Sequence, residues 1–101
     1  MGSDVSAAMS NRPVFELGQV IATPAALEFC DSYTVDLRGL LVRHQSGDCG
    51  EMNADDVLAN MDAILRGGAR VFSSYAIGLQ KIWIITEADR SNTTILLPSD
   101  Y

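Results

Sequence analysis

The chain has 101 residues, of which 48% are hydrophobic, and its formal net charge is −6 at pH 7. This length and composition fit one compact domain. The negative charge argues against binding to nucleic-acid phosphates, which requires a basic surface, and it leaves open a protein partner with a basic surface. No stretch approaches the ~20 apolar residues of a membrane span, so we expect a cytoplasmic protein without membrane contact.

The first residues and the cysteines add little to this description. The opening "MGSDVSAAMSN" is small, polar and aperiodic, and "MGS" is typical of a vector remnant. We therefore expect residues 1–11 to be disordered and residues 12–101 to form the domain. Cys30 and Cys49 lack the spacing of a metal site, which predicts two reduced thiols.

The first half of the domain reads as one strand followed by helices. Residues 14–21 alternate apolar and polar side chains, which predicts a strand. Thr23 and Pro24 are an N-cap and a first helical residue, so a short helix should start there. A second helix is expected from Thr34 to about His44, with one apolar face.

A third helix should begin after the N-cap Asn53, with Asp55 and Asp56 in its positive first turn, and end at Gly67-Gly68. Its apolar side chains recur at helical spacing, which predicts that they are buried together. These are Val57, Leu58, Met61, Ile64 and Leu65.

The rest of the chain has strand character over about 69–77, 81–87 and 92–97. The resulting order is β-α-α-α-β-β-β. It predicts the α+β class, with an antiparallel sheet of about four strands and helices packed mainly on one face.

Two turns predict the register of the last three strands. Gly78-Leu79 fits a two-residue hairpin loop, which pairs Tyr75 with Ile82 and places Arg70 opposite Glu87 as an ion pair. A four-residue loop at 88–91 pairs Ile84 with Ile95 and Trp83 with Leu96.

The middle strand is apolar on both faces, so each face must be covered or must form a patch. Helices could pack on the Ile82 and Ile84 side or on the Trp83 side, and either choice should leave one face short of cover. We expect the open face to be the interaction surface, most simply in a two-fold symmetric dimer. The candidate binding residues are Trp83, Phe72, Ile85, Leu96 and Arg90. For Arg90, a solvated loop tip and an anchor for a carboxylate or phosphate are both open interpretations.

A competing hypothesis is catalysis. His44 could act with Asp48, Glu51 or Asp89 in a small hydrolase or nuclease-like enzyme, and Cys49 is a conceivable nucleophile. A lone His/Cys combination is not a specific signal, and a histidine near a helix C-terminus is favourable for structural reasons. No metal-binding or phosphate-binding motif is present, so no metal and no cofactor are expected.

Residues 48–62 contain five acidic residues and no basic one. This stretch motivates an acidic inhibitor or mimic that occupies a basic nucleic-acid-binding surface, although most acidic helices are simply solvated.

Three stretches carry a family resemblance: "GQVIATPAALE", "RHQSGDCGE" and "KIWIITEADRSNTTILLPSDY". They resemble a family of small bacterial proteins usually labelled plasmid-related, and the C-terminal stretch is the most specific. In that family a Trp follows the Gly-Asp of the middle motif, whereas Cys49 stands here. The resemblance implies a mobile-element or genomic-island setting and no established activity. Together these observations favour a non-enzymatic accessory protein of a mobile element that acts through protein–protein contact.

Overall fold

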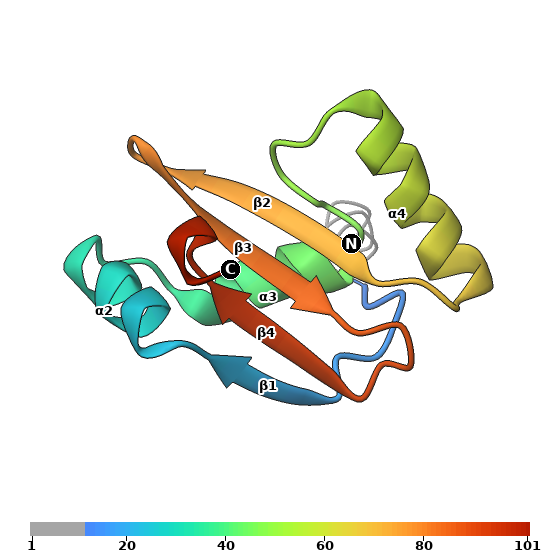
Figure 1. Cartoon of the computed structure of the whole chain (residues 1–101), viewed down its shortest axis with the longest axis horizontal. Coiled ribbons are helices and arrows are strands. Elements are labelled where there is room, and N and C mark those ends of the chain that lie inside the picture. Colours follow the sequence, from blue (N-terminus) through green and yellow to red (C-terminus); the bar gives the residue numbers. More distant parts are fainter. Residues whose placement is uncertain (1–11) are drawn as a thin grey trace, which may run out of the picture.

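The computed structural model describes residues 12–101 as a four-stranded sheet with three α-helices (Figure 1). The expected disorder of residues 1–11 lies outside the described residues. The elements are β1 (Gln19–Ala22), α2 (Pro24–Ser32), α3 (Leu37–Gln45), α4 (Ala54–Arg66), β2 (Val71–Ile77), β3 (Gln80–Thr86), β4 (Asn92–Leu96) and a final 3₁₀ turn, η1 (Pro98–Asp100). The α+β class and the predicted element order are confirmed.

The sheet is mixed, so the predicted all-antiparallel arrangement is wrong. The strand order is β1-β4-β3-β2, and β1 pairs with β4 in parallel, from Gln19 opposite Asn92 to Ala22 opposite Ile95. The first strand is also shorter than expected. Gly18 has a φ of +65°, and the Val14 N–H donates to the Gln45 carbonyl rather than to a strand.

The predicted caps of the first and third helices are confirmed. Thr23 accepts from the Ala26 N–H at 3.1 Å, and Asn53 accepts from the Asp56 N–H at 2.9 Å. Gly67 ends α4 with a φ of +74°. The second helix starts later than predicted, because Asp36 and not Thr34 supplies the N-cap, accepting from the Arg38 N–H at 3.0 Å.

The predicted strand register is confirmed. Ile77 faces Gln80 across Gly78-Leu79, Tyr75 faces Ile82, and Ile84 faces Ile95. The β2–β3 ladder ends at Val71 opposite Thr86. The expected Arg70–Glu87 ion pair is not among the ion pairs of residues 12–101.

The hydrophobic core lies on the Ile82 and Ile84 side of the sheet, where α2 and α3 pack. Figure 1 shows α3 crossing behind the strands, and the C-terminal turn lies in front of them. The buried core residues are Ala26, Phe29, Cys30, Leu40, Tyr75, Ile82, Ile84 and Ile95. The helices therefore leave the Trp83 side less covered. No helix within residues 12–101 is long and apolar enough to cross a membrane.

The predicted buried stripe of α4 is only partly confirmed, because Val57 and Ile64 are half-buried and the other three residues are not. The buried residues of the helix are Asn60 and Ala63, whereas Leu58, Met61 and Leu65 of the expected buried stripe are exposed. The helix is attached to the sheet edge by its small and polar side, and three large apolar side chains face outward.

Candidate functional site

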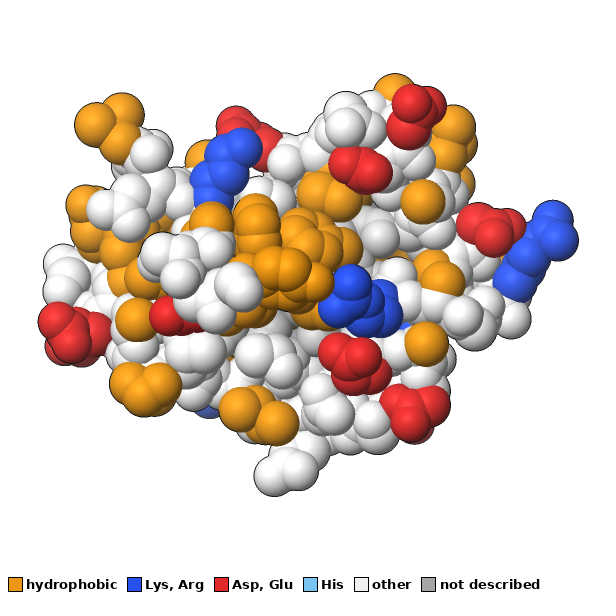
Figure 2. All heavy atoms as spheres, in the orientation of Figure 1, with side chains coloured by type: hydrophobic (Ala, Val, Ile, Leu, Met, Phe, Trp, Pro, Cys, Tyr) orange, Lys and Arg blue, Asp and Glu red, His pale blue; other side chains and the backbone are white. Residues whose placement is uncertain are grey.

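A groove runs along β2 on the Trp83 side of the sheet. Figure 2 shows hydrophobic side chains gathered on this face between α4 and the C-terminal turn. The groove is open, with a volume of about 1180 Å³. Its floor is formed by Phe72, Ser74 and Trp83; one wall comes from residues 51–60, and the other from residues 97–99.

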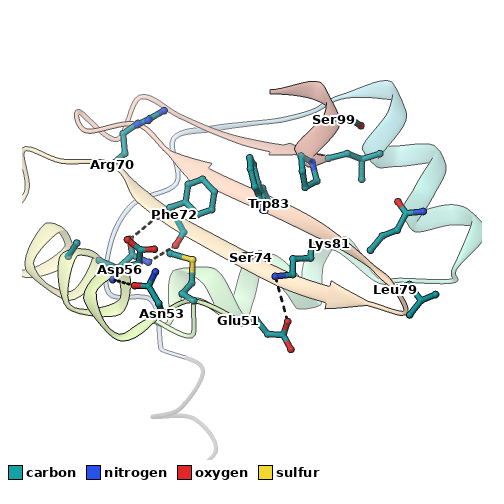
Figure 3. Close-up of a pocket in the computed structure, with 16 residues that line it drawn as sticks. Glu51, Asn53, Asp56, Arg70, Phe72, Ser74, Leu79, Lys81, Trp83 and Ser99 are labelled. Carbon is teal, nitrogen blue, oxygen red and sulfur yellow. Dashed lines mark hydrogen bonds and ion pairs between the residues drawn. The ribbon is translucent and has the colours of Figure 1, made fainter.

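Aromatic side chains dominate the floor. Phe72 and Trp83 stand side by side on neighbouring strands, with ring centroids 5.0 Å apart in an edge-to-face arrangement (Figure 3). The C-terminal Tyr101 meets the Trp83 ring at 5.8 Å. Trp83 keeps part of its surface accessible, so a ring or aliphatic side chain of a partner can stack there.

Charged side chains mark the ends and one wall of the groove. Arg70 lies at one end, where its guanidinium donates to the Tyr101 hydroxyl at 3.4 Å, and this contact raises the pKa of Arg70. Lys81 lies near the other end, 3.9 Å from the Glu51 carboxylate (Figure 3). Asp56 adds a second carboxylate to the wall that α4 forms.

The edge strand beside the groove has its backbone groups covered. Ser74 donates its N–H to the Cys49 carbonyl at 2.9 Å and accepts from the Glu51 N–H at 2.7 Å. The Asn60 side chain accepts from the Phe72 N–H at 3.0 Å and donates to the Phe72 carbonyl. A partner in the groove would thus meet side chains over this stretch rather than open strand hydrogen-bonding groups.

The predicted surface residues separate into two groups. Trp83 and Phe72 line the groove, whereas Ile85 and Leu96 share the same sheet face but are buried. Arg90 lies elsewhere: its guanidinium donates to the carbonyls of Ala63 and Ala69, each at 2.7 Å. Arg90 therefore ties the β3–β4 loop to the end of α4, a role that neither sequence interpretation anticipated.

His44 belongs to a buried hydrogen-bonded chain on the opposite side of the sheet. The Thr93 hydroxyl donates to the Leu17 carbonyl at 2.7 Å, so its 2.6 Å contact with Thr86 must use the Thr86 proton. Thr86 then accepts from His44 Nε2–H at 2.9 Å. The bare Nδ1 accepts from the Ser73 hydroxyl at 2.5 Å. The hydroxyl protons thus select a neutral histidine with its proton on Nε2.

This arrangement does not suit catalysis. His44 and Ser73 are both 0% exposed, so a substrate cannot reach the pair. Burial also lowers the pKa of His44 to about 4. Because both ring nitrogens bond to hydroxyl groups, the histidine lacks the carboxylate contact that the alternative enzyme hypothesis requires.

The candidate acidic partners of His44 are engaged elsewhere. Asp48 pairs with Arg43 at 2.7 Å, and this hydrogen bond lowers the pKa of Asp48. Asp89 accepts from the Ser91 N–H at 2.9 Å in the β3–β4 loop, and Glu51 faces Lys81. Among residues 12–101, no three His, Cys, Asp or Glu side chains gather as a metal site would require.

Comparison of the chain with protein-family models, with curated proteins and with solved structures gave no match.

Proposed function

We propose that the protein is a non-enzymatic binding module that holds a short segment of a partner protein in the groove along β2. The observation that carries this proposal is the partly accessible Trp83 side chain on a sheet face that α2 and α3 do not cover. A single tryptophan packed edge-to-face on Phe72 is a preformed platform, and aromatic residues are enriched among the residues that dominate binding energy.

The shape of the groove favours an extended segment. Its length along β2 from Arg70 to the level of Lys81, which pairs with Ala76, is roughly 20 Å at the usual rise of a strand, enough for about six extended residues. The walls formed by residues 51–60 and 97–99 would hinder a second flat sheet from lying on the floor. This shape suits a narrow chain better than the face-to-face sheet dimer expected from the sequence.

The charges suggest what that segment carries. Glu51 and Asp56 line one wall, where Lys81 lies near Glu51 but Asp56 is in no ion pair of residues 12–101, and the whole chain has a net charge of −6. A basic residue beside an apolar anchor would meet this wall, while the anchor contacts Trp83. If the resemblance to plasmid-related proteins holds, such a partner would be a protein of a mobile element.

A nucleic-acid mimic is less well supported by the same geometry. A mimic needs rows of unneutralised acids, but in the acidic stretch Asp48 pairs with Arg43 and Asp62 pairs with Arg66, each at 2.7 Å. Glu51 also lies near Lys81. Residues 48–62 therefore form a wall of the groove and do not form a continuous negatively charged face.

Selection of short random peptides displayed on phage tests the proposal. Peptides enriched on the wild-type protein should share an aromatic or large aliphatic residue next to Lys or Arg. They should bind Trp83→Ala at least ~10-fold more weakly, since hot-spot truncations typically cost 2 kcal/mol or more. Leu27→Ala is the matched control, because Leu27 is exposed on α2 and away from the groove. Equal retention by Trp83→Ala and the wild type would refute the proposal.

A further inference from the structure

Helix α4 presents an apolar stripe to solvent on the side away from the groove. Leu58, Met61 and Leu65 are 63%, 52% and 81% exposed. Their spacing of i, i+3 and i+7 places them on one side of the helix, in a row about 10 Å long. Groups of large apolar side chains on a soluble protein often mark an interaction site.

The attachment of α4 to the sheet explains why this stripe is free. Asn60 holds the helix through the two backbone groups of Phe72, and Arg90 holds the Ala63 carbonyl. These polar contacts and the buried Ala63 occupy the inner side of the helix. Figure 1 shows α4 at the margin of the molecule, beside β2 and not across the sheet. The outer side is therefore accessible to a second helix.

The charged residues beside the stripe favour a second copy of α4 as its partner. Asp55, Asp62 and Arg66 lie along the same flank at helical spacing, with Asp55 in the first turn and Arg66 in the last. In an antiparallel helix pair, the same flanks of the two helices meet. Arg66 of each helix pairs with Asp62 of its own helix at 2.7 Å and would also approach Asp55 of the other helix. Leu58 would pack near Leu65 around a central pair of Met61 side chains.

The other occupants fit less well. A parallel pair would place the charged flank of each helix against the opposite, uncharged flank of the other, so Arg66 would have no Asp55 of the partner to meet. A membrane surface favours helices with Lys and Arg on the polar side, whereas this flank carries two acids and one Arg. We propose that the protein forms a two-fold symmetric dimer through antiparallel packing of α4 on α4. The dimer would leave both grooves open, because the α4 residues that line the groove, Asp56, Ala59 and Asn60, are not part of the apolar stripe.

Sedimentation equilibrium of the full chain tests the dimer. A contact of this size should have a dissociation constant in the micromolar range, so the wild type should be mainly dimeric at about 200 µM. Leu65→Glu should weaken the dimer at least ~10-fold while leaving the thermal unfolding of the monomer nearly unchanged, because Leu65 makes little contact within the chain. Leu79→Glu, at the fully exposed hairpin tip, is the control and should remain dimeric.

Charge reversal tests the antiparallel arrangement separately. Arg66→Glu alone and Asp55→Arg alone should each weaken the dimer several-fold, and the double variant should regain most of the wild-type affinity. A monomeric wild type at about 200 µM would overturn the proposal. A dimer insensitive to Leu65→Glu, or lost in Leu79→Glu instead, would also overturn it, and failure of the double variant to recover would exclude the antiparallel pair.

Discussion

His44 is the only histidine of the chain, and both nitrogens of its ring are hydrogen bonded inside the fold. Its partners Ser73 and Thr86 are 29 and 42 residues away in sequence. Each hydroxyl donates one hydrogen bond to the next acceptor, and the chain of hydrogen bonds ends at the Leu17 carbonyl. All hydroxyl groups of the network therefore donate in one direction. If His44 were protonated at Nδ1, the Ser73 hydroxyl could no longer donate to that atom.

The stability of the protein should therefore depend on pH through His44. Burial lowers the pKa of His44 to about 4 in the folded state, against about 6.5 in the unfolded chain, so the unfolded chain binds more protons between these limits. Stability is complete above about pH 6.5 and falls as pH decreases toward 4, by about 3 kcal/mol in total. Urea unfolding between pH 7.5 and about 4.5 measures this slope.

The variant His44→Gln is the control for that slope. It should be less stable than the wild type at pH 7.5 but should lose little further stability on acidification to about 4.5. The hydrogen-bonded carboxylates Asp48, Asp89 and Asp100 have lowered pKa values, so their contribution is lost mainly below this range. An equal slope in the wild type and in His44→Gln would contradict the assignment.

Two glycines of one loop should differ in their tolerance of a side chain. Gly50 has a φ of +72°, and a Cβ there would lie 2.2 Å from the Ser74 carbonyl oxygen. Gly47 has a φ of +94° with nothing within 4 Å of its Cβ position. Gly47→Ala should cost about 1 kcal/mol from backbone strain alone. Gly50→Ala should cost at least ~3 kcal/mol, since it must also break the bridge to β2; equal costs in thermal unfolding would be inconsistent with the close contact.

At the scale of elements, α4 shows the limit of periodicity as a guide to burial. Its apolar residues do recur at helical spacing, but periodicity identifies a shared side without saying what covers it. The opposite side contains Asn60. Its side-chain amide bonds the N–H and the carbonyl of Phe72, as a neighbouring strand would. Because this contact is made by a polar residue, the hydrophobic pattern of the sequence does not show which side of the helix faces the sheet. By contrast, the caps of α2 and α4 and the hairpin turns are encoded in a few adjacent residues and were predictable.

Asn60 should contribute strongly to stability. Asn60→Ala leaves the N–H and carbonyl of Phe72 without protein partners at the sheet edge, which should cost about 2 kcal/mol. It also exposes the β2 edge, so aggregation on heating should increase. Ala59→Ser, on the neighbouring exposed position of α4, is the control and should change stability by less than ~0.5 kcal/mol. Unfolding of Asn60→Ala at the wild-type midpoint would show that the amide does not hold the edge.

The parallel pairing of β1 with β4 was not predictable for a related reason. The strand character of residues 19–22 is visible in the sequence, but its partner is set by three intervening helices and by contacts such as Gln19 N–H to the Ser91 carbonyl at 3.0 Å. Long-range contacts of this kind also determine the role of Arg90. Its carbonyl partners Ala63 and Ala69 are 27 and 21 residues away, and no local pattern marks them.

At the scale of the whole molecule, α4 separates two surfaces. Its inner residues form a wall of the Trp83 groove, and its outer residues form the apolar stripe. In the proposed dimer the two grooves are displayed by one rigid pair of helices, which would strengthen binding to a partner that carries two segments. The sequence located Trp83 and Phe72 by strand alternation, whereas the walls of the groove depend on how α4 and the C-terminal residues pack.

Fluorescence of Trp83 tests the groove most directly, because it is the only tryptophan of the chain. Titration of the protein with a peptide enriched by phage selection should shift the emission of Trp83 to shorter wavelength as the ring loses water. The transition should saturate at the dissociation constant measured independently by calorimetry. If the peptide binds in the calorimeter while the emission of Trp83 stays unchanged, the partner lies elsewhere and the groove is not the binding site.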